Sequence, residues 1–228
     1  MKISATIMAA GKSSRMAGEN KLLLRYGQSS IIRSICETVI ASRFHPIMVI
    51  TGFEKEKIEV ELSELKIQLI YNPDWEDGMA TSINTGIAAL PKEIDGNLIS
   101  LGDMPLIGGT ILEKLKGAFD SNSGKRIIYP LYNDHQGNPV IFPRKYFDKI
   151  LSTTGDRGCK KILKQYPENA IGVPVRSKEV VLDCDTPDDY LKLNKNKKLW
   201  VIQLDILPNI KFIIKLDNCL DRILQNEN

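Results

Sequence analysis

Short apolar runs rich in β-branched residues alternate along this chain with longer segments whose apolar positions recur every three or four residues. The short runs predict buried strands, and the longer segments predict amphipathic helices. Such alternation is typical of βαβ units, in which helices cover both faces of a mainly parallel sheet. The expected strands are Ile3–Ala9, Ile47–Thr51, Ile67–Tyr71, Asn97–Leu101, Arg126–Leu131 and Pro139–Phe142, and the expected helices are Ser30–Arg43, Lys55–Ser63, Ala80–Leu90 and Thr110–Phe119.

The pattern becomes less regular after residue 132. Residues 133–138 read as a turn, whereas Arg144–Leu151 and Cys159–Tyr166 read as helices. Two further apolar runs, Ala170–Val175 and Val180–Asp183, are expected as strands, with antiparallel pairing as one option. The sequence therefore predicts an α/β fold with a mixed, mainly parallel sheet.

Composition narrows the class of protein. The 228 residues are 43% hydrophobic, which is enough for a substantial core, and 31 Lys and Arg against 28 Asp and Glu leave a formal charge of +3. That excess is too small to indicate a nucleic-acid partner. No uninterrupted apolar run approaches the roughly 20 residues that cross a bilayer, and no signal-peptide pattern is visible. We expect a soluble, cytoplasmic protein that binds neither nucleic acid nor membrane.

Two regions differ in character along the chain. Residues 1–194 are expected to form one domain, and residues 195–228 form a C-terminal extension of unknown role that begins with a lysine-rich run. The cysteines are scattered and make no C-x-x-C pair, which fits reduced thiols in the cytoplasm.

A glycine-rich, basic loop follows the first expected strand. It reads AAGKSSRMAGENK from Ala9 to Lys21. Its glycines permit sharp turns that bring backbone N–H groups close to a polyanion, while Ser13 and Ser14 can donate hydrogen bonds and Arg15 adds positive charge. The loop suits a nucleoside triphosphate, and an ordinary surface loop with solvated charges is the alternative.

Two common phosphate motifs are excluded for this loop. Gly11-Lys12-Ser13 copies the end of the P-loop pattern G-x-x-x-x-G-K-[ST], but that pattern requires glycine at position 6, where Thr6 stands. The dinucleotide fingerprint G-x-G-x-x-G is also missing. A phosphate bound by this loop would therefore be held by neither of these two motifs.

Carboxylates follow two of the apolar runs. Asp103 comes directly after the strand expected at Asn97–Leu101 and the small Gly102, and the carboxyl ends of strands are where ligands bind in open α/β sheets. Asp185 follows the run Val180–Asp183. Because Mg²⁺ is usually held by one or two carboxylates plus substrate phosphates, these acids are candidates for a shared Mg²⁺ site, with local capping as the alternative.

Weaker signals lie at three helix starts. Thr81 and Ser82 are suited to contacting a ribose or base, or to capping the helix that follows them. Asp156 and Arg157 stand in a glycine-flanked loop before a basic helix, where a second phosphorylated substrate could bind. Thr186 resembles an N-cap, because a proline and two acids follow it at the first turn.

Six segments taken in order resemble one known family, the molybdenum cofactor cytidylyltransferases among the MobA-like nucleotidyltransferases. The resemblance covers roughly residues 1–193. The segments are Ala9–Met16 with Asn20–Leu24, Gly78-Met79, Gly102–Pro105, Gly137–Val140, Gly155–Gly158 and Asp183–Pro187.

This resemblance implies a Rossmann-like, three-layer αβα nucleotidyltransferase fold and transfer of CMP from CTP to the terminal phosphate of molybdenum-molybdopterin, with release of pyrophosphate. It implies catalytic roles for Arg15, Lys21 and Asp103, with Asp103 and Asp185 as Mg²⁺ ligands. The implied nucleotide-binding residues are Ala9, Ala10, Gly11, Lys12, Ser13, Ser14, Arg15, Lys21, Gly78, Thr81, Ser82 and Asp103.

The second substrate is assigned by the same resemblance. Asn138, Pro139, Asp156 and Arg157 are implied to bind the molybdopterin-type acceptor, although Asn138 replaces a histidine that is frequent in the family. The Ala-Ala-Gly opening favours CTP, because guanylyl relatives usually carry Ala-Gly-Gly. A guanylyltransferase, a cytidylyltransferase for another phosphorylated acceptor such as methylerythritol phosphate, and a non-catalytic cofactor carrier that docks on a molybdenum hydroxylase through its tail are the alternatives.

Overall fold

A mixed sheet forms the centre of the computed structural model, which describes residues 1–13, 15–16, 19–155 and 159–194. Within these residues the strand order is β10-β7-β9-β6-β1-β4-β5, with β8 beside β7. The pairs β6-β1, β1-β4, β4-β5 and β10-β7 are parallel, whereas β9 runs antiparallel to both β6 and β7. The strands are β1 (Ile3–Ala9), β4 (Ile47–Thr51), β5 (Gln68–Tyr71), β6 (Gly96–Leu101), β7 (Ile127–Tyr132), β8 (His135–Gln136), β9 (Val140–Pro143) and β10 (Ala170–Pro174).

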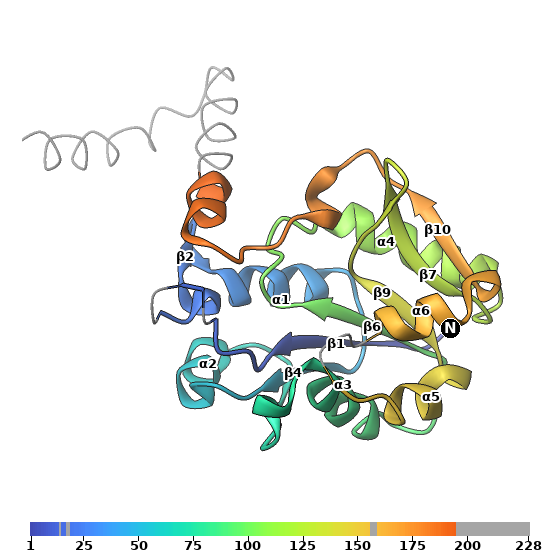
Figure 1. The fold of residues 1–228 in the computed structure, drawn as a ribbon, viewed down its shortest axis with the longest axis horizontal. Helices are drawn as coiled ribbons and strands as arrows, with labels where there is room; N and C mark the ends of the chain where they lie inside the picture. The colour runs from blue at the N-terminus through green and yellow to red at the C-terminus, as the bar shows by residue number, and fades with distance from the viewer. Residues whose placement is uncertain (14, 17–18, 156–158, 195–228) are drawn as a thin grey trace, which may run out of the picture.

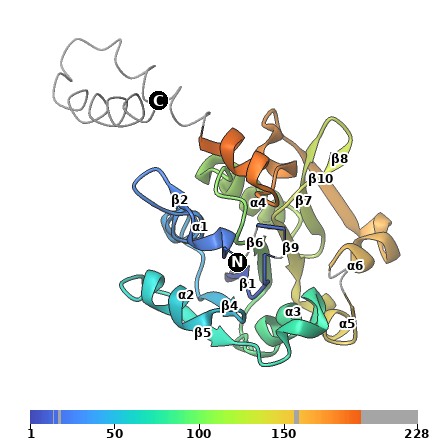
Figure 2. The ribbon, with the colours of Figure 1, turned by 60° about the vertical axis from the view of Figure 1, so that its left-hand side comes forward.

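Helices cover both faces of this sheet, as Figures 1 and 2 show. One face packs against α1 (Ile31–Ala41), α2 (Lys55–Leu62) and α4 (Gly109–Ser121). The other packs against α3 (Met79–Ala88), α5 (Phe147–Leu151) and α6 (Lys160–Gln165). The three-layer αβα arrangement with a mainly parallel sheet confirms the predicted fold class.

Short elements complete the described chain. A two-stranded ribbon, β2 with β3, precedes α1, and a helical segment over residues 187–194 lies beside it, where Tyr190 Oη donates to the Arg25 carbonyl oxygen at 2.9 Å. The two short strands are β2 (Arg25–Tyr26) and β3 (Ser29–Ser30). The short 3-10 helices are η1 (Lys21–Leu23), η2 (Trp75–Asp77), η3 (Arg144–Tyr146), η4 (Pro167–Asn169) and η5 (Lys178–Val181).

The central strand β1 explains how the two hydrophobic layers are divided. All of its residues are buried, as expected for a strand covered on both faces. Side chains alternate along a strand, so Ile7 packs in the layer of α1 and α4 while Met8 packs in the layer of α3. Buried Thr6 does not remain unpaired, because Asn97 Nδ2 on β6 donates to its hydroxyl at 2.9 Å.

Most predicted elements are found within one or two residues of their expected bounds, but one strand expected in the second half is wrong and the antiparallel option for another is not realised. Val180–Asp183 is not a strand: residues 178–181 form the short 3-10 helix η5, which packs beside β7 and buries the Val180 side chain in the core. β10 is parallel to β7, because the chain returns through α5 and α6 and so crosses over before it pairs. The turn predicted at residues 133–138 also contains the short strand β8.

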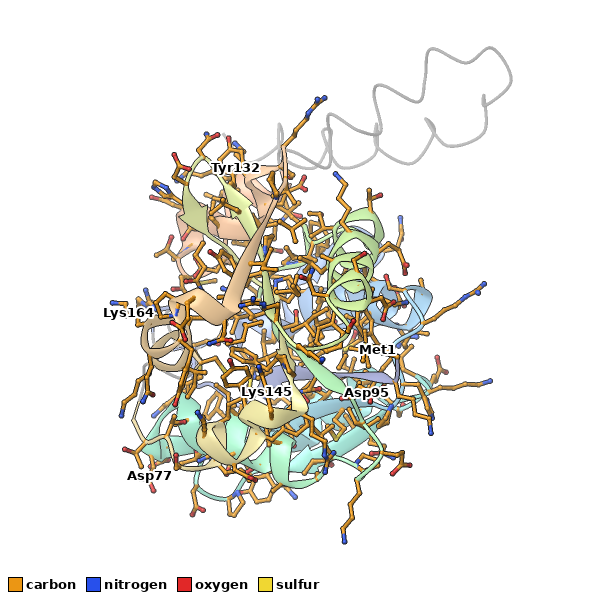
Figure 3. All side chains as sticks on the ribbon, turned by 90° about the vertical axis from the view of Figure 1, so that its right-hand side faces the viewer. Met1, Asp77, Asp95, Tyr132, Lys145 and Lys164 are labelled. Carbon is orange, nitrogen blue, oxygen red and sulfur yellow. The ribbon has the colours of Figure 1, made fainter. Side chains whose placement is uncertain are left out.

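The two edges of the sheet differ in what they carry. At the edge where β1 and β6 begin, the Lys2 backbone N–H donates to Asp95 Oδ2 at 2.8 Å, and Met1 and Asp95 lie close together in Figure 3. The opposite edge, where β1 and β6 end, carries the glycine-rich loop and Asp103. Within the described residues, no helix is both long and apolar enough to cross a bilayer.

Candidate active site

A cavity of about 540 Å³ opens at the carboxyl ends of β1 and β6. Its walls come from the loop after β1, the start of α3, the turn after β6 and the segment before residue 187. This is the edge at which ligands bind in open α/β sheets. The predicted site residues that line it are Ala10, Gly11, Ser13, Arg15, Lys21, Gly78, Ser82, Asp103 and Asp185.

Lys21 is held at this cavity by the turn that follows the glycine-rich loop. The buried Asn20 caps η1, because its side-chain oxygen accepts from the Leu22 backbone N–H at 3.2 Å. Leu22 is buried in the core, and the Lys21 backbone N–H donates to Ser13 Oγ at 3.3 Å. The backbone of Lys21 is therefore anchored on both sides.

Asp103 reaches the cavity because a glycine precedes it. The Gly102 backbone N–H donates to the Met8 carbonyl oxygen at 3.0 Å, which carries the β1–β6 pairing one residue beyond the strand. A Cβ at Gly102 would lie 2.6 Å from that carbonyl oxygen and 2.9 Å from Ile32 Cδ1, so no other residue fits without displacement. The close approach sets where Asp103 projects.

The segment that carries Asp185 is fixed at both of its ends. On one side the Asn138 backbone N–H donates to the Val180 carbonyl oxygen at 2.8 Å. On the other side Thr186 and Asp189 form a reciprocal cap: the Asp189 N–H donates to Thr186 Oγ1 at 3.2 Å and the Thr186 N–H donates to Asp189 Oδ2 at 3.1 Å. The predicted N-cap at Thr186 is confirmed.

Asp103 and Asp185 meet at one ammonium group. Lys21 Nζ lies 2.5 Å from Asp103 Oδ2 and 2.5 Å from Asp185 Oδ1, and Arg15 Nη2 lies 2.8 Å from Asp185 Oδ2. The side chains of Lys21 and Asp103 are each 14% exposed, whereas that of Arg15 is 67% exposed. Two acids and two cations from distant parts of the chain thus share one cluster at the cavity wall.

Burial and the charges of this cluster shift the pKa of several groups in and beside it. Burial on its own would lower the pKa of Lys21, but the carboxylates of Asp103 and Asp185 outweigh it and raise that pKa. Partial burial, together with the negative charges of Asp185 and Asp103, raises the pKa of Asp183, which also lines the cavity. The Lys21 side chain is therefore cationic throughout the physiological range.

The acid pair has the chemistry of a magnesium site completed by substrate. No group of three or more His, Cys, Asp and Glu side chains suited to a metal occurs among the described residues, so an all-protein cage is absent there. Asp103 Oδ1 is buried without a hydrogen-bond partner in the described structure. Two converging carboxylates with a spare oxygen fit Mg²⁺, which needs few protein ligands when phosphates and waters supply the rest.

Three residues predicted to bind the nucleotide do not line the cavity. Thr81 Oγ1 donates to the Gly78 carbonyl oxygen at 2.9 Å and accepts from Asn72 Nδ2 at 2.9 Å, so it stabilises the start of α3 rather than lining the cavity. Ala9 is buried in the core, and Lys12 Nζ lies 6.0 Å from the Phe53 ring centroid.

The two described residues among those expected to bind the acceptor do not line this cavity. Asn138 and Pro139 are absent from its lining, and Asn138 instead supports the segment that carries Asp185. Asp156 and Arg157, together with Ser14 of the glycine-rich loop, lie outside the described residues.

Several cavity-lining residues escaped selection from the sequence. Trp75 lines the cavity and packs against Phe53 with ring centroids 5.7 Å apart, and Met79 adds a second apolar wall. An aromatic residue in a turn-rich segment was the available signal for Trp75, but ring contacts depend on the fold. Asp183 also lines the cavity. Its signal in the sequence was its position two residues before Asp185, since such residues project to the same side of an extended chain.

Comparisons with known proteins agree with this arrangement. A family model described as the MobA-like NTP transferase domain matches residues 5–170. The molybdenum cofactor cytidylyltransferase of Escherichia coli (strain K12) is 28% identical over 192 residues, which cover 83% of this chain and 94% of that relative. The nicotine blue oxidoreductase of Paenarthrobacter nicotinovorans is 22% identical over 202 residues, covering 84% of this chain and 96% of that protein.

A solved structure extends the likeness to three dimensions. The crystal structure of Rv0371c from Mycobacterium tuberculosis superposes with a TM-score of 0.77 at 25% identity, covering 85% of this chain and 97% of that one. The comparisons confirm the resemblance carried by the six ordered segments.

Proposed function

Because the chain belongs to the MobA-like NTP transferase family and is a nucleotidyltransferase, we propose that it transfers CMP from CTP to the terminal phosphate of a molybdenum-bearing molybdopterin and releases pyrophosphate. The observation that carries the proposal is the meeting of Asp103 and Asp185 at the Lys21 ammonium, beside the glycine-rich loop. The choice of substrates is supported by the 28% identity to a molybdenum cofactor cytidylyltransferase along nearly its whole length.

The cations and the loop act on the triphosphate. Arg15 and Lys21 line the same cavity as Gly11 and Ser13, so a triphosphate there would meet two positive charges as well as loop donors. Neutralising the charge that builds up on the departing pyrophosphate is the main electrostatic task in phosphoryl-group chemistry. Lys21 and Arg15 are placed for that task.

The acids hold the metal. Asp103 and Asp185 would bind Mg²⁺, which supplies charge neutralisation to the phosphate oxygens when bound. The acceptor phosphate has a second pKa near 6 and is ionised at neutral pH, so no side chain is required to remove a proton from it. The chain has only to align that oxygen with the α-phosphorus of CTP and to keep both substrates in place.

The start of α3 is the proposed contact for the ribose and base of the nucleotide. Gly78 and Ser82 line the cavity together with Trp75. The Ala9-Ala10-Gly11 opening supports CTP over GTP through the family resemblance.

A single assay with varied nucleotides tests the function. Purified protein with Mg²⁺ and molybdenum-loaded molybdopterin should release pyrophosphate from CTP, and omission of the acceptor should abolish the release. Equal release from GTP would support a guanylyltransferase instead. Well-folded protein that releases no pyrophosphate from either nucleotide would remove the proposal.

The same assay addresses the carrier hypothesis. Residues 195–228, the proposed docking tail, lie outside the described residues, so the hypothesis stays a prediction. Deletion of residues 195–228 should leave CMP transfer intact if the chain is an enzyme. A carrier that docks through the tail would instead lose its partner.

A further inference from the structure

The Lys21 ammonium stands between two carboxylates that would otherwise repel each other. Its Nζ is 2.5 Å from Asp103 Oδ2 and 2.5 Å from Asp185 Oδ1. All three side chains are largely buried, at 14%, 14% and 23% exposure, so solvent screens the charges poorly. One internal positive charge therefore holds the acid pair together.

A divalent metal bound by this pair would lie within a few ångströms of the ammonium, because Lys21 already contacts one oxygen of each carboxylate. Mg²⁺ binds carboxylate oxygens at about 2.0–2.1 Å and tolerates little departure from octahedral geometry. An ammonium group and a divalent ion in the same gap would repel each other across a few ångströms of poorly screened space. The two cations cannot occupy this gap together.

The Lys21 side chain is free to leave while its backbone stays in place. The backbone is anchored by the Ser13 hydroxyl and by the capped turn at Asn20. The four-carbon stem of lysine has rotatable bonds and carries a compact charge at its end, so it can turn toward the cavity that Ser13 and Arg15 line. Phosphate groups in that cavity would offer the ammonium a new anionic partner.

We propose that Lys21 acts as an internal cation for Asp103 and Asp185 in the free protein and exchanges places with the divalent metal when a nucleoside triphosphate enters. The inference rests on the proposed function for the presence of a triphosphate and a metal. It couples two binding events: the free protein binds metal weakly, because the metal must displace Lys21, and the triphosphate removes that obstacle by attracting the ammonium.

Titration with Mn²⁺ in the absence of nucleotide tests the exchange. Free Mn²⁺ is followed by its electron paramagnetic resonance signal for the wild type, Lys21→Met and Lys21→Gln. Both variants lose the positive charge, and glutamine keeps N–H donors that can hold the acids if the methionine variant does not fold. We expect both variants to bind Mn²⁺ about tenfold or more tightly than the wild type, since the metal no longer breaks a charge-assisted hydrogen bond to each acid.

A matched control separates this effect from general loss of a lysine. Lys116 is 21% exposed, lies 3.4 Å from Glu113 Oε1 and donates to the Ser42 carbonyl oxygen at 2.7 Å, on α4 and outside the cavity lining. Lys116→Met should bind Mn²⁺ as the wild type does. Adding Asp185→Asn to Lys21→Gln should remove the gain, which would place the bound Mn²⁺ at the acid pair.

Unchanged or weaker Mn²⁺ binding by Lys21→Gln, in folded protein, would overturn the exchange. The titration contains neither CTP nor acceptor, so its outcome is independent of substrate identity. Tighter Mn²⁺ binding by the variants without CMP transfer by the wild type would reject the substrates and keep the exchange. CMP transfer by the wild type without tighter Mn²⁺ binding by the variants would reject the exchange and keep the proposed substrates.

Discussion

Asp103→Asn separates the structural role of Asp103 from its proposed catalytic role. The amide has nearly the same shape, so it can still accept a hydrogen bond from Lys21, but it carries no charge. A hydrogen bond to a charged group contributes about 1.5–3 kcal/mol and a neutral one about 0.5–1.5 kcal/mol. Because Asp185 remains 2.5 Å from the ammonium, we expect the unfolding free energy to fall by only about 1 kcal/mol.

The expected loss of activity is much larger. A metal ligand contributes several kcal/mol of charge stabilisation in the transition state, and each 1.36 kcal/mol is tenfold in rate. We therefore expect kcat/KM for pyrophosphate release to fall about a thousandfold, while the melting temperature falls by about 2–4 °C, the usual shift per kcal/mol in a chain of this size.

Thermal unfolding and a coupled pyrophosphate assay measure the two quantities on the same preparation. Asp120→Asn is the control, because Asp120 pairs with the terminal amino group at 3.5 Å, is 50% exposed and lies on α4 away from the cavity. It should change neither quantity appreciably. Full activity in Asp103→Asn, or an activity loss no larger than the unfolded fraction explains, would refute a catalytic role for Asp103.

Three further changes test the parts that position the acids. Gly102→Ala should lower the unfolding free energy by about 1–3 kcal/mol in urea titrations, because its Cβ would lie 2.6 Å from the Met8 carbonyl oxygen; wild-type stability would contradict the close approach. Asp183→Asn should be more stable than the wild type at pH 7, because the raised pKa of Asp183 makes its charge unfavourable in the folded state. That advantage should shrink as the pH falls toward 3.8, and a constant advantage would rule out its electrostatic origin. Thr186→Ala should cost about 1 kcal/mol by removing the cap shared with Asp189, and it should also slow CMP transfer, since that cap fixes the acid segment; unchanged transfer would show that the cap is purely structural.

The first half of the fold was predictable because its signals are local. The apolar runs Ile3–Ala9 and Ile47–Thr51 became strands with the same bounds, since uninterrupted burial and β-branched residues agree there. The run Val180–Asp183 carries the same local signal, but residues 178–181 form a 3-10 helix beside β7, and Val180 packs against the Gly137–Asn138 backbone. Pairing partners are a tertiary property that periodicity does not contain.

The candidate site was likewise predictable only where its signals are local in the sequence. Arg15, Lys21, Asp103 and Asp185 could be selected because charged residues beside glycines at strand ends stand out in the sequence. The contacts of the Lys21 ammonium could not be predicted, because Asp103 follows Lys21 by 82 positions and Asp185 follows it by 164. Asn138 stood in a segment that resembles the family, yet its backbone N–H holds Val180, and sequence alone does not separate support of a site from contact with a ligand.

The position of Asp185 so late in the chain has a consequence for biosynthesis. The family match ends at residue 170, and β1, β4, β5 and β6 all precede the point at which the second acid is translated. A nascent chain can therefore complete much of its sheet while Lys21 has only one of its two carboxylates. Since proteins are made from the amino terminus onward, the proposed reaction centre can be complete only after residue 185 has been translated, and products shortened before that position would lack its second acid.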